Sequence, residues 1–295
     1  MSLYSVWVLE YAFVQNYNVS GVLYGAHNQG YLKLPYAYVV IKGEGRVMMV
    51  DVGYNQKDYG KVLADRFGVE AWHSPREVLA QIGITPEDVD TIFVTHAHFD
   101  HMGNLGDFPN AHVYIQEREL TRAIWALSQP ARLSFVSIAT DPADVLVCAA
   151  LAQQGRLTLL DGDREEVLPG IDLHAAPDTH TFGSQYVVVR NDGLAQSADP
   201  WVLAGDLIYV YENIEGDGSV IGVEQMYVPV GVAVGSQTNL VFATEEIMKA
   251  ANGEVRRVIP VHERRLTERF PSQERESGLR VSEICLANGE VSRLG

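Results

Sequence analysis

The sequence predicts an α/β protein in which two packed β-sheets carry helices on their outer faces, a four-layer αββα sandwich. Two observations predict it: strand-like runs occur in both halves of the chain, and each half also contains helical patterns. The chain has 295 residues, 47% of them hydrophobic, so it can bury a sizeable core. Because no Ser/Gly/Pro-rich linker divides it, we expect a single domain over residues 1–295.

The N-terminal third is rich in strand signals, because runs of Val, Tyr and Met are bounded there by turn residues. We expect strands over three of these runs, residues 5–14, 36–42 and 46–52. Ser74 and Glu77 form a capping box around Pro75, which indicates the start of a helix. A similar cap at Thr85 precedes an apolar strand over residues 91–95.

Between residues 117 and 155 the spacing of apolar residues becomes that of helices. Leu120, Ile124 and Leu127 lie three and four positions apart, and Asp141 begins a second helix. We expect a helical insertion around 117–155 that either caps the functional site or packs on the sandwich.

Beyond residue 155 the strand-like runs return. They lie at residues 156–160, 171–175, 185–190, 201–204, 257–261 and 279–286. One helix is expected among them, over residues 243–252. Strands therefore dominate both halves of the chain, as two packed sheets require.

Charge and cysteine content exclude several classes of function. With 22 Lys+Arg against 38 Asp+Glu, the formal net charge is −16, and such a surface repels nucleic acid and anionic membranes. Cys148 and Cys285 lie far apart without CxxC spacing, so we expect neither a disulfide framework nor a thiolate metal site. The first residues carry no basic segment followed by a long apolar run, so we expect a cytoplasmic protein.

A cluster of histidines with one aspartate follows the apolar strand at 91–95. His96, His98, Asp100 and His101 lie within six residues. A strand end and the turn after it can direct imidazoles and a carboxylate toward one point, and both groups are good zinc ligands. The alternative, a polar surface loop, gives no reason for four ligand-type residues at one strand end.

Three more residues are candidates for the same site. Asp206 and His262 each end an apolar strand, and His180 lies in a turn-rich loop before one. Taken alone, Asp206 could be a turn residue and His262 a hydrogen-bonded histidine. Four ligands are too many for one zinc ion that keeps a coordination position open, and too few for two ions. We therefore expect these residues to complete the site.

In their order along the chain, these residues resemble the metallo-β-lactamase superfamily, which implies the metallo-β-lactamase fold. An HxHxDH motif is followed by a loop His, a Gly-Asp pair and a strand-end His, and the resemblance ends at His262. The sequence is most similar to the N-acyl homoserine lactonase-like branch, whose members have a catalytic Tyr three residues after the bridging Asp. Tyr209 has that position after Asp206, although an ordinary packing role remains open.

The resemblance implies a site with two zinc ions, for which Fe, Mn or Co could substitute. The first ion would be held by His96, His98 and His180. The second would be held by Asp100, His101 and His262. Asp206 would bridge the two ions, and Asp51 would orient a ligand histidine.

The resemblance also implies a reaction. Metal-bound hydroxide would attack the carbonyl of a lactone or a related cyclic ester. Tyr209 and the first zinc would stabilise the oxyanion, and Asp100 would protonate the leaving alkoxide. The expected partner is a small-molecule substrate, and a homodimer is a further expectation because relatives are often dimers.

One loop departs from the family pattern, which commonly reads TPGHTPGH. Phe182 replaces a Pro and Ser184 replaces the second His, whereas His180 and Gly183 match. The changed surroundings of His180 leave the substrate open. Same-fold hydrolysis of a thioester, a cyclic amide or an aryl halide is therefore an alternative, as is a metal-binding scaffold without catalysis.

Overall fold

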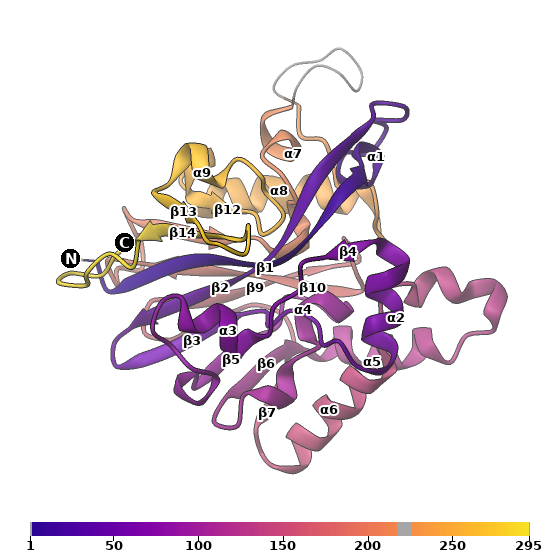
Figure 1. Cartoon of the computed structure of the whole chain (residues 1–295), viewed down its shortest axis with the longest axis horizontal. Helices are drawn as coiled ribbons and strands as arrows, with labels where there is room; N and C mark the ends of the chain where they lie inside the picture. Colours follow the sequence, from indigo (N-terminus) through magenta and orange to yellow (C-terminus); the bar gives the residue numbers. More distant parts are fainter. Residues whose placement is uncertain (1, 217–225, 295) are drawn as a thin grey trace.

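The strand-like runs form two β-sheets that pack face to face in the computed structural model, which describes residues 2–216 and 226–294 (Figure 1). The larger sheet has nine strands in the order β13-β14-β1-β2-β3-β5-β6-β7, with β4 paired to β1. Its strands are β1 Tyr4–Asn18, β2 Tyr31–Gly43, β3 Arg46–Val50, β4 Val69–Glu70, β5 Thr91–Phe93, β6 His112–Gln116, β7 Leu157–Leu160, β13 Ser272–Glu274 and β14 Arg280–Cys285.

The smaller sheet has five strands in the order β12-β11-β10-β9-β8. Its strands are β8 Arg164–Leu168, β9 Ile171–Pro177, β10 Gly183–Arg190, β11 Pro200–Leu203 and β12 Val258–Ile259. The strands β8 to β11 pair antiparallel with their neighbours, whereas β11 and β12 run parallel.

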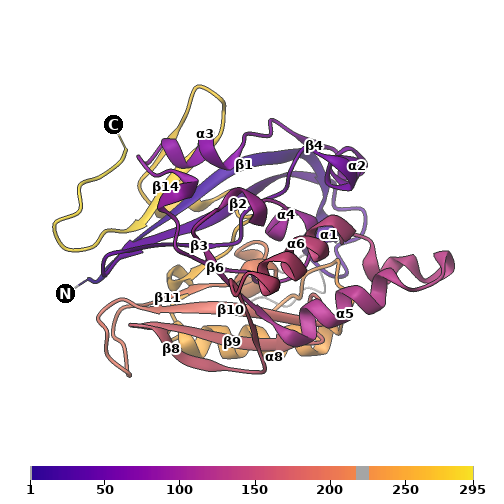
Figure 2. The same ribbon diagram turned by 90° about the horizontal axis from the view of Figure 1, so that it is seen from below.

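Helices cover the outer faces of both sheets, which confirms the four-layer sandwich (Figure 2). Helices α3 and α6 pack on the larger sheet, and α8 packs on the smaller one. The α-helices are α1 Val19–Val22, α2 Asp58–Phe67, α3 Pro75–Ala80, α4 Phe99–Met102, α5 Glu117–Leu127, α6 Pro142–Gln153, α7 Glu212–Glu215, α8 Gln237–Ala250 and α9 Leu266–Arg269. Short 3-10 turns are η1 Pro86–Asp88, η2 Leu105–Asp107, η3 Ala131–Ser137, η4 Gly205–Leu207 and η5 Val255–Arg257.

Strand β1 shows how the core divides between the layers. Tyr4 and Val8 point into the apolar cluster between the sheets, whereas Trp7 and Leu9 belong to the cluster beneath the helices. All four side chains are buried. Because both faces of the strand are covered here, residues 6–9 are all apolar rather than alternating with polar residues.

Parallel pairing gathers several strand ends at one edge of the molecule. Strands β3, β5, β6 and β7 run parallel in the larger sheet, as β11 and β12 do in the smaller sheet. In parallel sheets the residues that follow the carboxyl ends of neighbouring strands lie close together. The polar residues after β3, β5, β11 and β12 are therefore candidates for a shared site.

Several elements differ from those expected. Helix α2 and strands β6 and β8 were not predicted, and α8 begins at Gln237 rather than at residue 243. The side chain of Ser236 accepts a hydrogen bond from Asn239 N and so caps α8 earlier. Strand β8 lies at the edge of its sheet with its first three residues exposed, so it lacks the apolar alternation of a covered strand.

No single helix in the described ranges is long and apolar enough to cross a bilayer. One bent pair, Ala131–Ser137 with Pro142–Gln153, meets that length and composition only across a 58° break.

Candidate metal centre

The HxHxDH cluster lies at the carboxyl end of β5, and α4 begins inside it. Asp206 lies in η4 directly after β11, and His262 lies three residues after β12. His180 lies in the turn that joins β9 to β10. The strand ends of both sheets therefore bring the predicted ligands together, in two groups of side chains.

The first group consists of His96, His98, His180 and Asp206, whose ligand-type atoms lie within 4.8 Å of one another. His98 Nδ1 lies 3.0 Å from His96 Nε2 and 3.1 Å from His180 Nε2. His180 Nε2 lies 3.3 Å from Asp206 Oδ2. Three imidazole nitrogens and one carboxylate oxygen thus surround one small volume, a donor set suited to a tetrahedral divalent ion.

The second group consists of Asp100, His101 and His262, whose ligand-type atoms also lie within 4.8 Å of one another. Asp206 Oδ1 lies 3.2 Å from His101 Nε2 and 3.1 Å from His262 Nε2. Since its other oxygen lies beside His180, the Asp206 carboxylate presents one oxygen to each group. This is the arrangement of a carboxylate that bridges two ions.

Neighbouring oxygens orient the ligand histidines. Asp51 follows β3 and accepts hydrogen bonds from Thr95 N (2.7 Å) and Thr95 Oγ1 (2.8 Å). Its Oδ2 atom lies 2.8 Å from His101 Nδ1, and the carbonyl oxygen of Pro35 lies 2.6 Å from His262 Nδ1. When Nδ1 donates to such an oxygen, Nε2 is left as the acceptor that faces the site.

The chemistry of these residues fits a divalent metal. Within the described part of the chain, His101 Nε2 and Asp206 Oδ1 are buried atoms without a hydrogen-bond partner. Burial lowers the pKa of His96 and His98 well below the usual value and that of His180 to about 4, so each imidazole is neutral. Burial opposes ionisation of Asp206, but the neighbouring histidines hold its pKa well below the usual range. The first group thus has neutral imidazoles beside an ionised carboxylate, as metal binding requires. Burial opposes protonation of His101 and His262 as well, but the charges of Asp206 and Asp100 raise the pKa of both, so these two imidazoles would release protons when a metal binds.

The two groups lie at the base of a pocket of about 210 Å³. Apart from ligand-group side chains, its walls are aromatic or aliphatic. They are Tyr17, Leu34, Tyr36, Phe67, Phe99, Phe135, Ile138, Ala139, Tyr209, Val232, Ala233 and Val234. Among these described residues there is no Lys or Arg, so the walls offer no cation to an anionic ligand.

Tyr209 lines the pocket beside the ligand groups. Its ring centroid is 4.8 Å from that of His262 and 5.7 Å from that of His180. Burial, reinforced by the charge of Asp206, raises the pKa of Tyr209 well above its usual value. The phenol therefore stays protonated and can act as a hydrogen-bond donor at the base of the pocket.

Sequence reasoning missed most of the pocket wall. Tyr36 packs edge-on against His262 with ring centroids 5.0 Å apart, and Phe67 lies in the unpredicted helix α2. Phe99, inside the HxHxDH cluster, stacks on Phe67 and also lines the pocket. The apolar run that contains Val232 and Val234 carries no signal that separates a pocket wall from core.

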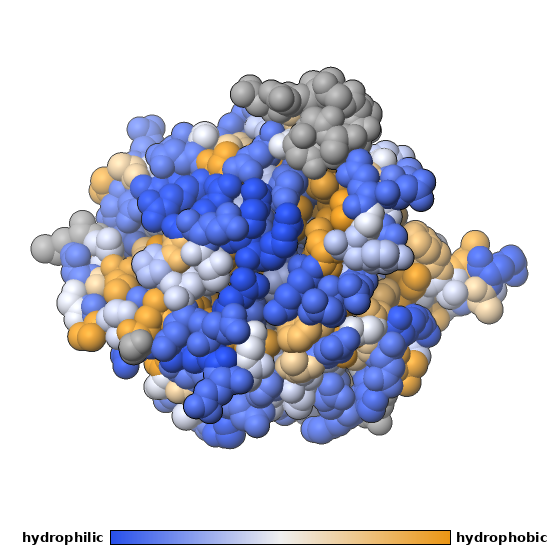
Figure 3. Space-filling view, turned by 45° about the horizontal axis from the view of Figure 1, so that its top comes forward, coloured by the Kyte–Doolittle hydropathy of each residue, from blue (hydrophilic) through white to orange (hydrophobic). Residues whose placement is uncertain are grey.

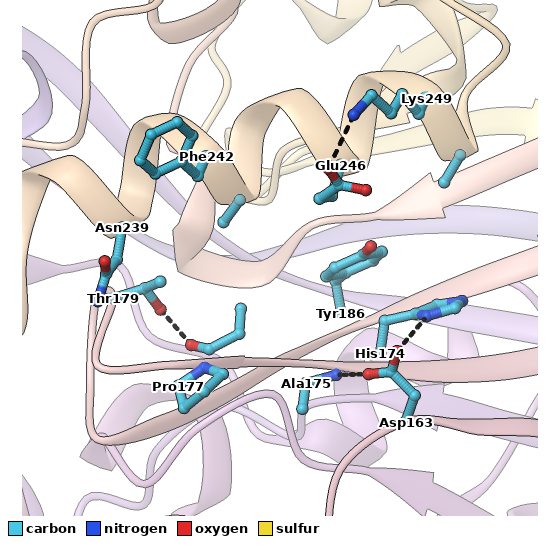
Figure 4. Close-up of a pocket in the computed structure, with 13 residues that line it drawn as sticks. Asp163, His174, Ala175, Pro177, Thr179, Tyr186, Asn239, Phe242, Glu246 and Lys249 are labelled. Atoms are coloured by element: carbon cyan, nitrogen blue, oxygen red, sulfur yellow. Dashed lines mark hydrogen bonds and ion pairs between the residues drawn. The ribbon is translucent and has the colours of Figure 1, made fainter.

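The other histidines of the described chain lie outside both ligand groups. They are His27, His73, His112 and His174. The ring of His174 stacks on Tyr186, and its Nδ1 lies 3.5 Å from Asp163 Oδ2. His174, Tyr186 and Asp163 line a separate pocket of about 780 Å³ between α8 and the strands β9 and β10 (Figure 4). On the helical side of that pocket, Lys249 pairs with Glu246 at 2.9 Å.

A family model described as the metallo-beta-lactamase superfamily matches residues 32–262. An N-acyl homoserine lactonase from Bacillus sp is 26% identical over 140 residues, which cover 48% of this chain and 47% of that protein. A probable metallo-hydrolase of Mycobacterium tuberculosis is 30% identical over 106 residues, 33% of this chain and 34% of that one. The matched segments therefore span about half, or less, of these curated relatives.

Solved structures match over a longer stretch. A point mutant of B. thuringiensis AiiA with N-decanoyl-L-homoserine bound at its active site has a TM-score of 0.67 and 18% identity, covering 91% of this chain and 96% of that one. AidC, a dizinc quorum-quenching lactonase in complex with a product, has a TM-score of 0.63 and 17% identity, covering 95% and 94%. These likenesses show a shared fold. The family model covers more than half of the sequence and spans all seven predicted ligands, so the chain belongs to the metallo-beta-lactamase superfamily.

Proposed function

We propose that this chain is a metal-dependent hydrolase that binds two divalent cations, zinc by preference, and opens a lactone or a related cyclic ester. One observation carries the proposal: two groups of ligand-type side chains share Asp206 beneath a pocket with apolar walls. Two-metal hydrolytic sites are built in this way, with a carboxylate between the ions.

The proposed ligands follow the two groups. His96, His98 and His180 would hold the first ion, Asp100, His101 and His262 the second, and Asp206 both. Bound divalent ions would supply Lewis acidity and lower the pKa of a coordinated water to about 7. Zinc is favoured because imidazole and carboxylate oxygen suit it, although Fe, Mn and Co accept similar ligands.

Asp100 and Tyr209 are the proposed catalytic residues. The protonated hydroxyl of Tyr209 would donate a hydrogen bond to the substrate carbonyl oxygen, where negative charge develops during attack. The Asp100 carboxylate would take up the proton released by the attacking water and deliver it to the leaving alkoxide. Both side chains line the pocket, where a substrate would meet them.

The pocket walls support a neutral substrate with an apolar substituent. Substrates such as glutathione thioesters carry carboxylates, and burying an unpaired carboxylate is costly. The described lining residues include no Lys or Arg to compensate that cost. The B. thuringiensis AiiA mutant holds N-decanoyl-L-homoserine, an acid with a long apolar acyl chain, at its active site. A lactone with such a chain would place it against the apolar walls of the present pocket.

The helical segment 117–155 is proposed to cap this pocket within a single domain over residues 1–295. Phe135 and Ile138 from this segment line the pocket, and Phe135 is 56% exposed. Figure 3 shows hydrophobic surface on the side of the molecule that carries the extension between α5 and α6. An apolar chain that extends out of the pocket would contact this surface.

A small-molecule substrate, a cytoplasmic location and a homodimer complete the proposal. Two apolar segments of the described chain are buried within the monomer and would leave a dimer interface to other surfaces. Val228 and Val230 of the run 228–235 are buried, as are Tyr4 and Tyr11 of the N-terminal segment. Light scattering coupled to size-exclusion chromatography measures the oligomeric state directly.

A hydrolysis assay with a pH indicator tests the reaction. The panel holds acyl homoserine lactones, simple γ- and δ-lactones, an aromatic lactone, a cyclic amide, an aryl halide and a glutathione thioester, with chelator-treated protein as the control. Turnover of a lactone that the chelator abolishes is the expected result. Turnover of only the amide, halide or thioester would contradict the lactone and favour that alternative, and two bound ions without any turnover would favour the scaffold.

A pair of histidine variants tests the ligand assignment. His98→Ala should lose metal and activity together, because it removes one of the three imidazoles of the first ligand group. His98 Nδ1 lies 3.0 Å from His96 Nε2 and 3.1 Å from His180 Nε2. His174→Ala is the matched control, since His174 lies in the pocket beside α8. Full metal content and activity in His98→Ala would refute the proposed site.

A further inference from the structure

A buried carboxylate lies directly beneath the first ligand group. Glu119, in the first turn of α5, is 2% exposed, and its side chain accepts three hydrogen bonds. The donors are Ala97 N at 2.7 Å, Gly183 N at 2.6 Å and Thr181 Oγ1 at 2.9 Å. Burial raises the pKa of Glu119, and these three uncharged donors oppose that effect. A carboxylate is expensive to bury, so its presence here calls for a specific role.

The three donors belong to the two loops that carry the three histidines of the first ligand group. Ala97 lies between His96 and His98, and Thr181 directly follows His180. Oε1 of Glu119 holds the first loop, whereas Oε2 holds the second. One side chain thus links two segments that are more than 80 positions apart in sequence and that carry three of the four side chains in this group.

The start of α5 also approaches the second loop closely through its backbone. A Cβ atom added at Gly183 would lie 2.5 Å from Glu119 N, so only glycine permits this contact. On the outer side, Arg118 Nε donates to the carbonyl oxygen of Phe182 at 2.8 Å. The Phe182 ring packs edge-on against Trp125 of α5, with centroids 5.8 Å apart.

These contacts give a role to the residues that depart from the family loop. Phe182 packs on α5, and Ser184 Oγ lies 2.7 Å from Thr181 Oγ1 while it accepts a hydrogen bond from Thr181 N. Ser184 therefore supports the hydroxyl that donates to Glu119, whereas Phe182 packs the loop against α5. The loop is built around the start of α5, at the beginning of the segment that is proposed to cap the pocket.

We propose that Glu119 is a positioning residue that sets the separation of His98 and His180 and so the metal affinity of the first ligand group. The inference rests on the proposed function, since it assumes that this group holds a cation. Residues that orient ligands commonly change metal affinity about 10–100-fold when they are replaced. Glu119 would act indirectly, because it contacts the loops that carry the ligands and not the ligand side chains themselves.

The decisive variant is Glu119→Gln, which keeps the size of the side chain. A glutamine offers one acceptor oxygen, and its NH₂ group would face a backbone N–H that then loses its partner. We expect one of the two metal ions to bind at least about tenfold more weakly than in the wild type, as measured by competition with a chromophoric chelator. We also expect an altered visible spectrum of the Co²⁺-substituted protein, which reports ligand geometry and which a loss of stability alone would not change.

Two further variants keep the test decisive. Glu117→Gln changes an exposed carboxylate in the same helical turn and should leave metal affinity and spectrum as in the wild type. Thr181→Val removes one of the three donors with almost no change in shape and should give the same spectral change, smaller in size. If Glu119→Gln fails to fold, Thr181→Val provides the readout.

The outcomes separate the two proposals. A wild-type chain that binds two ions, together with Glu119→Gln and Thr181→Val variants that match Glu117→Gln in affinity and spectrum, would overturn the role of Glu119 alone. A wild-type chain that binds no divalent ion would instead overturn the proposed function.

Discussion

At the scale of single residues, the proposal of two ions depends on Asp206. Its Oδ2 lies 3.3 Å from His180 Nε2 and its Oδ1 lies 3.1 Å from His262 Nε2, so the two oxygens serve different groups. Five imidazoles and two carboxylates lie close together in this small volume. Without cations, the buried carboxylate of Asp206 would be the shared neighbour of most of these side chains. This density of ligand-type side chains is what supports the proposal of two ions rather than one.

Tyr209 gives the sharpest test of catalysis by a single atom. Tyr209→Phe should lower kcat for lactone hydrolysis about 100-fold, because it removes one hydrogen-bond donor from the developing oxyanion, while metal content stays unchanged. Tyr211→Phe is the matched control, since Tyr211 is equally buried, its hydroxyl has no hydrogen-bond partner, and it does not line the pocket. Equal kcat values in the two variants would assign Tyr209 to packing.

At the scale of elements, a strap of residues 226–236 forms one wall of the pocket. Val232 N donates to Gly21 O at 3.1 Å on one side, and Val234 N donates to His180 O at 3.0 Å on the other. The strap therefore joins the tip of the β1–β2 hairpin to a loop of the ligand groups (Figure 1). Its position depends on how closely its backbone can approach both neighbours.

Gly231→Ala tests that dependence. A Cβ at Gly231 would lie 1.7 Å from Ser20 O, so the strap would have to move. We expect a loss of about 1–3 kcal/mol in the free energy of unfolding, measured by denaturant titration, and a higher KM for any substrate that touches Val232. Gly106→Ala is the control, because its Cβ would meet no atom within 4 Å. Wild-type stability and KM in Gly231→Ala would show that the strap is not held by this contact.

Helix α6 carries a buried carboxyl whose titration should affect stability. Burial, and secondarily the charge of Asp141, raises the pKa of Asp144 to about 8. Between pH 4 and 8 the folded state thus keeps a proton that the unfolded state releases, so this group favours folding at low pH. Its contribution falls as pH rises, by up to about 1.4 kcal/mol per pH unit.

Asp144→Asn should remove that slope. Denaturant unfolding of metal-free protein at several pH values between 4 and 8 measures it, and the exposed Asp107→Asn variant is the control. The variant should gain stability relative to the wild type as pH rises. Parallel stability curves for Asp144→Asn and the wild type would contradict the raised pKa.

At the scale of the whole molecule, the sequence predicted the layers and the ligand candidates better than the pocket. His96, Asp206 and His262 were identifiable because each follows an apolar strand, and parallel pairing brings such ends together. Tyr36 and Phe67 were not identifiable as pocket residues, because a side chain that lines a cavity obeys the same apolar pattern as one in the core. Glu119 looked like an ordinary charge at the start of a helix, and only the tertiary contacts reveal its partners.

The proposed ions would also fasten the two sheets together. His96 follows β5 of the larger sheet, whereas Asp206 and His262 follow β11 and β12 of the smaller one. An ion that binds only the folded chain adds about 2.7 kcal/mol at a concentration 100 times its Kd, and for a chain of this size that raises Tm by roughly 4 °C. Chelation should therefore lower Tm by at least that amount in calorimetry, and added Zn²⁺ should restore it.

His174→Ala should show the same metal-dependent shift, because His174 lies outside both groups, whereas His262→Ala should show a smaller one. A Tm unchanged by removal of all bound metal would mean that the sheets hold the ligand groups in place without the ions, and that the site is preorganised by protein contacts such as those of Asp51 alone.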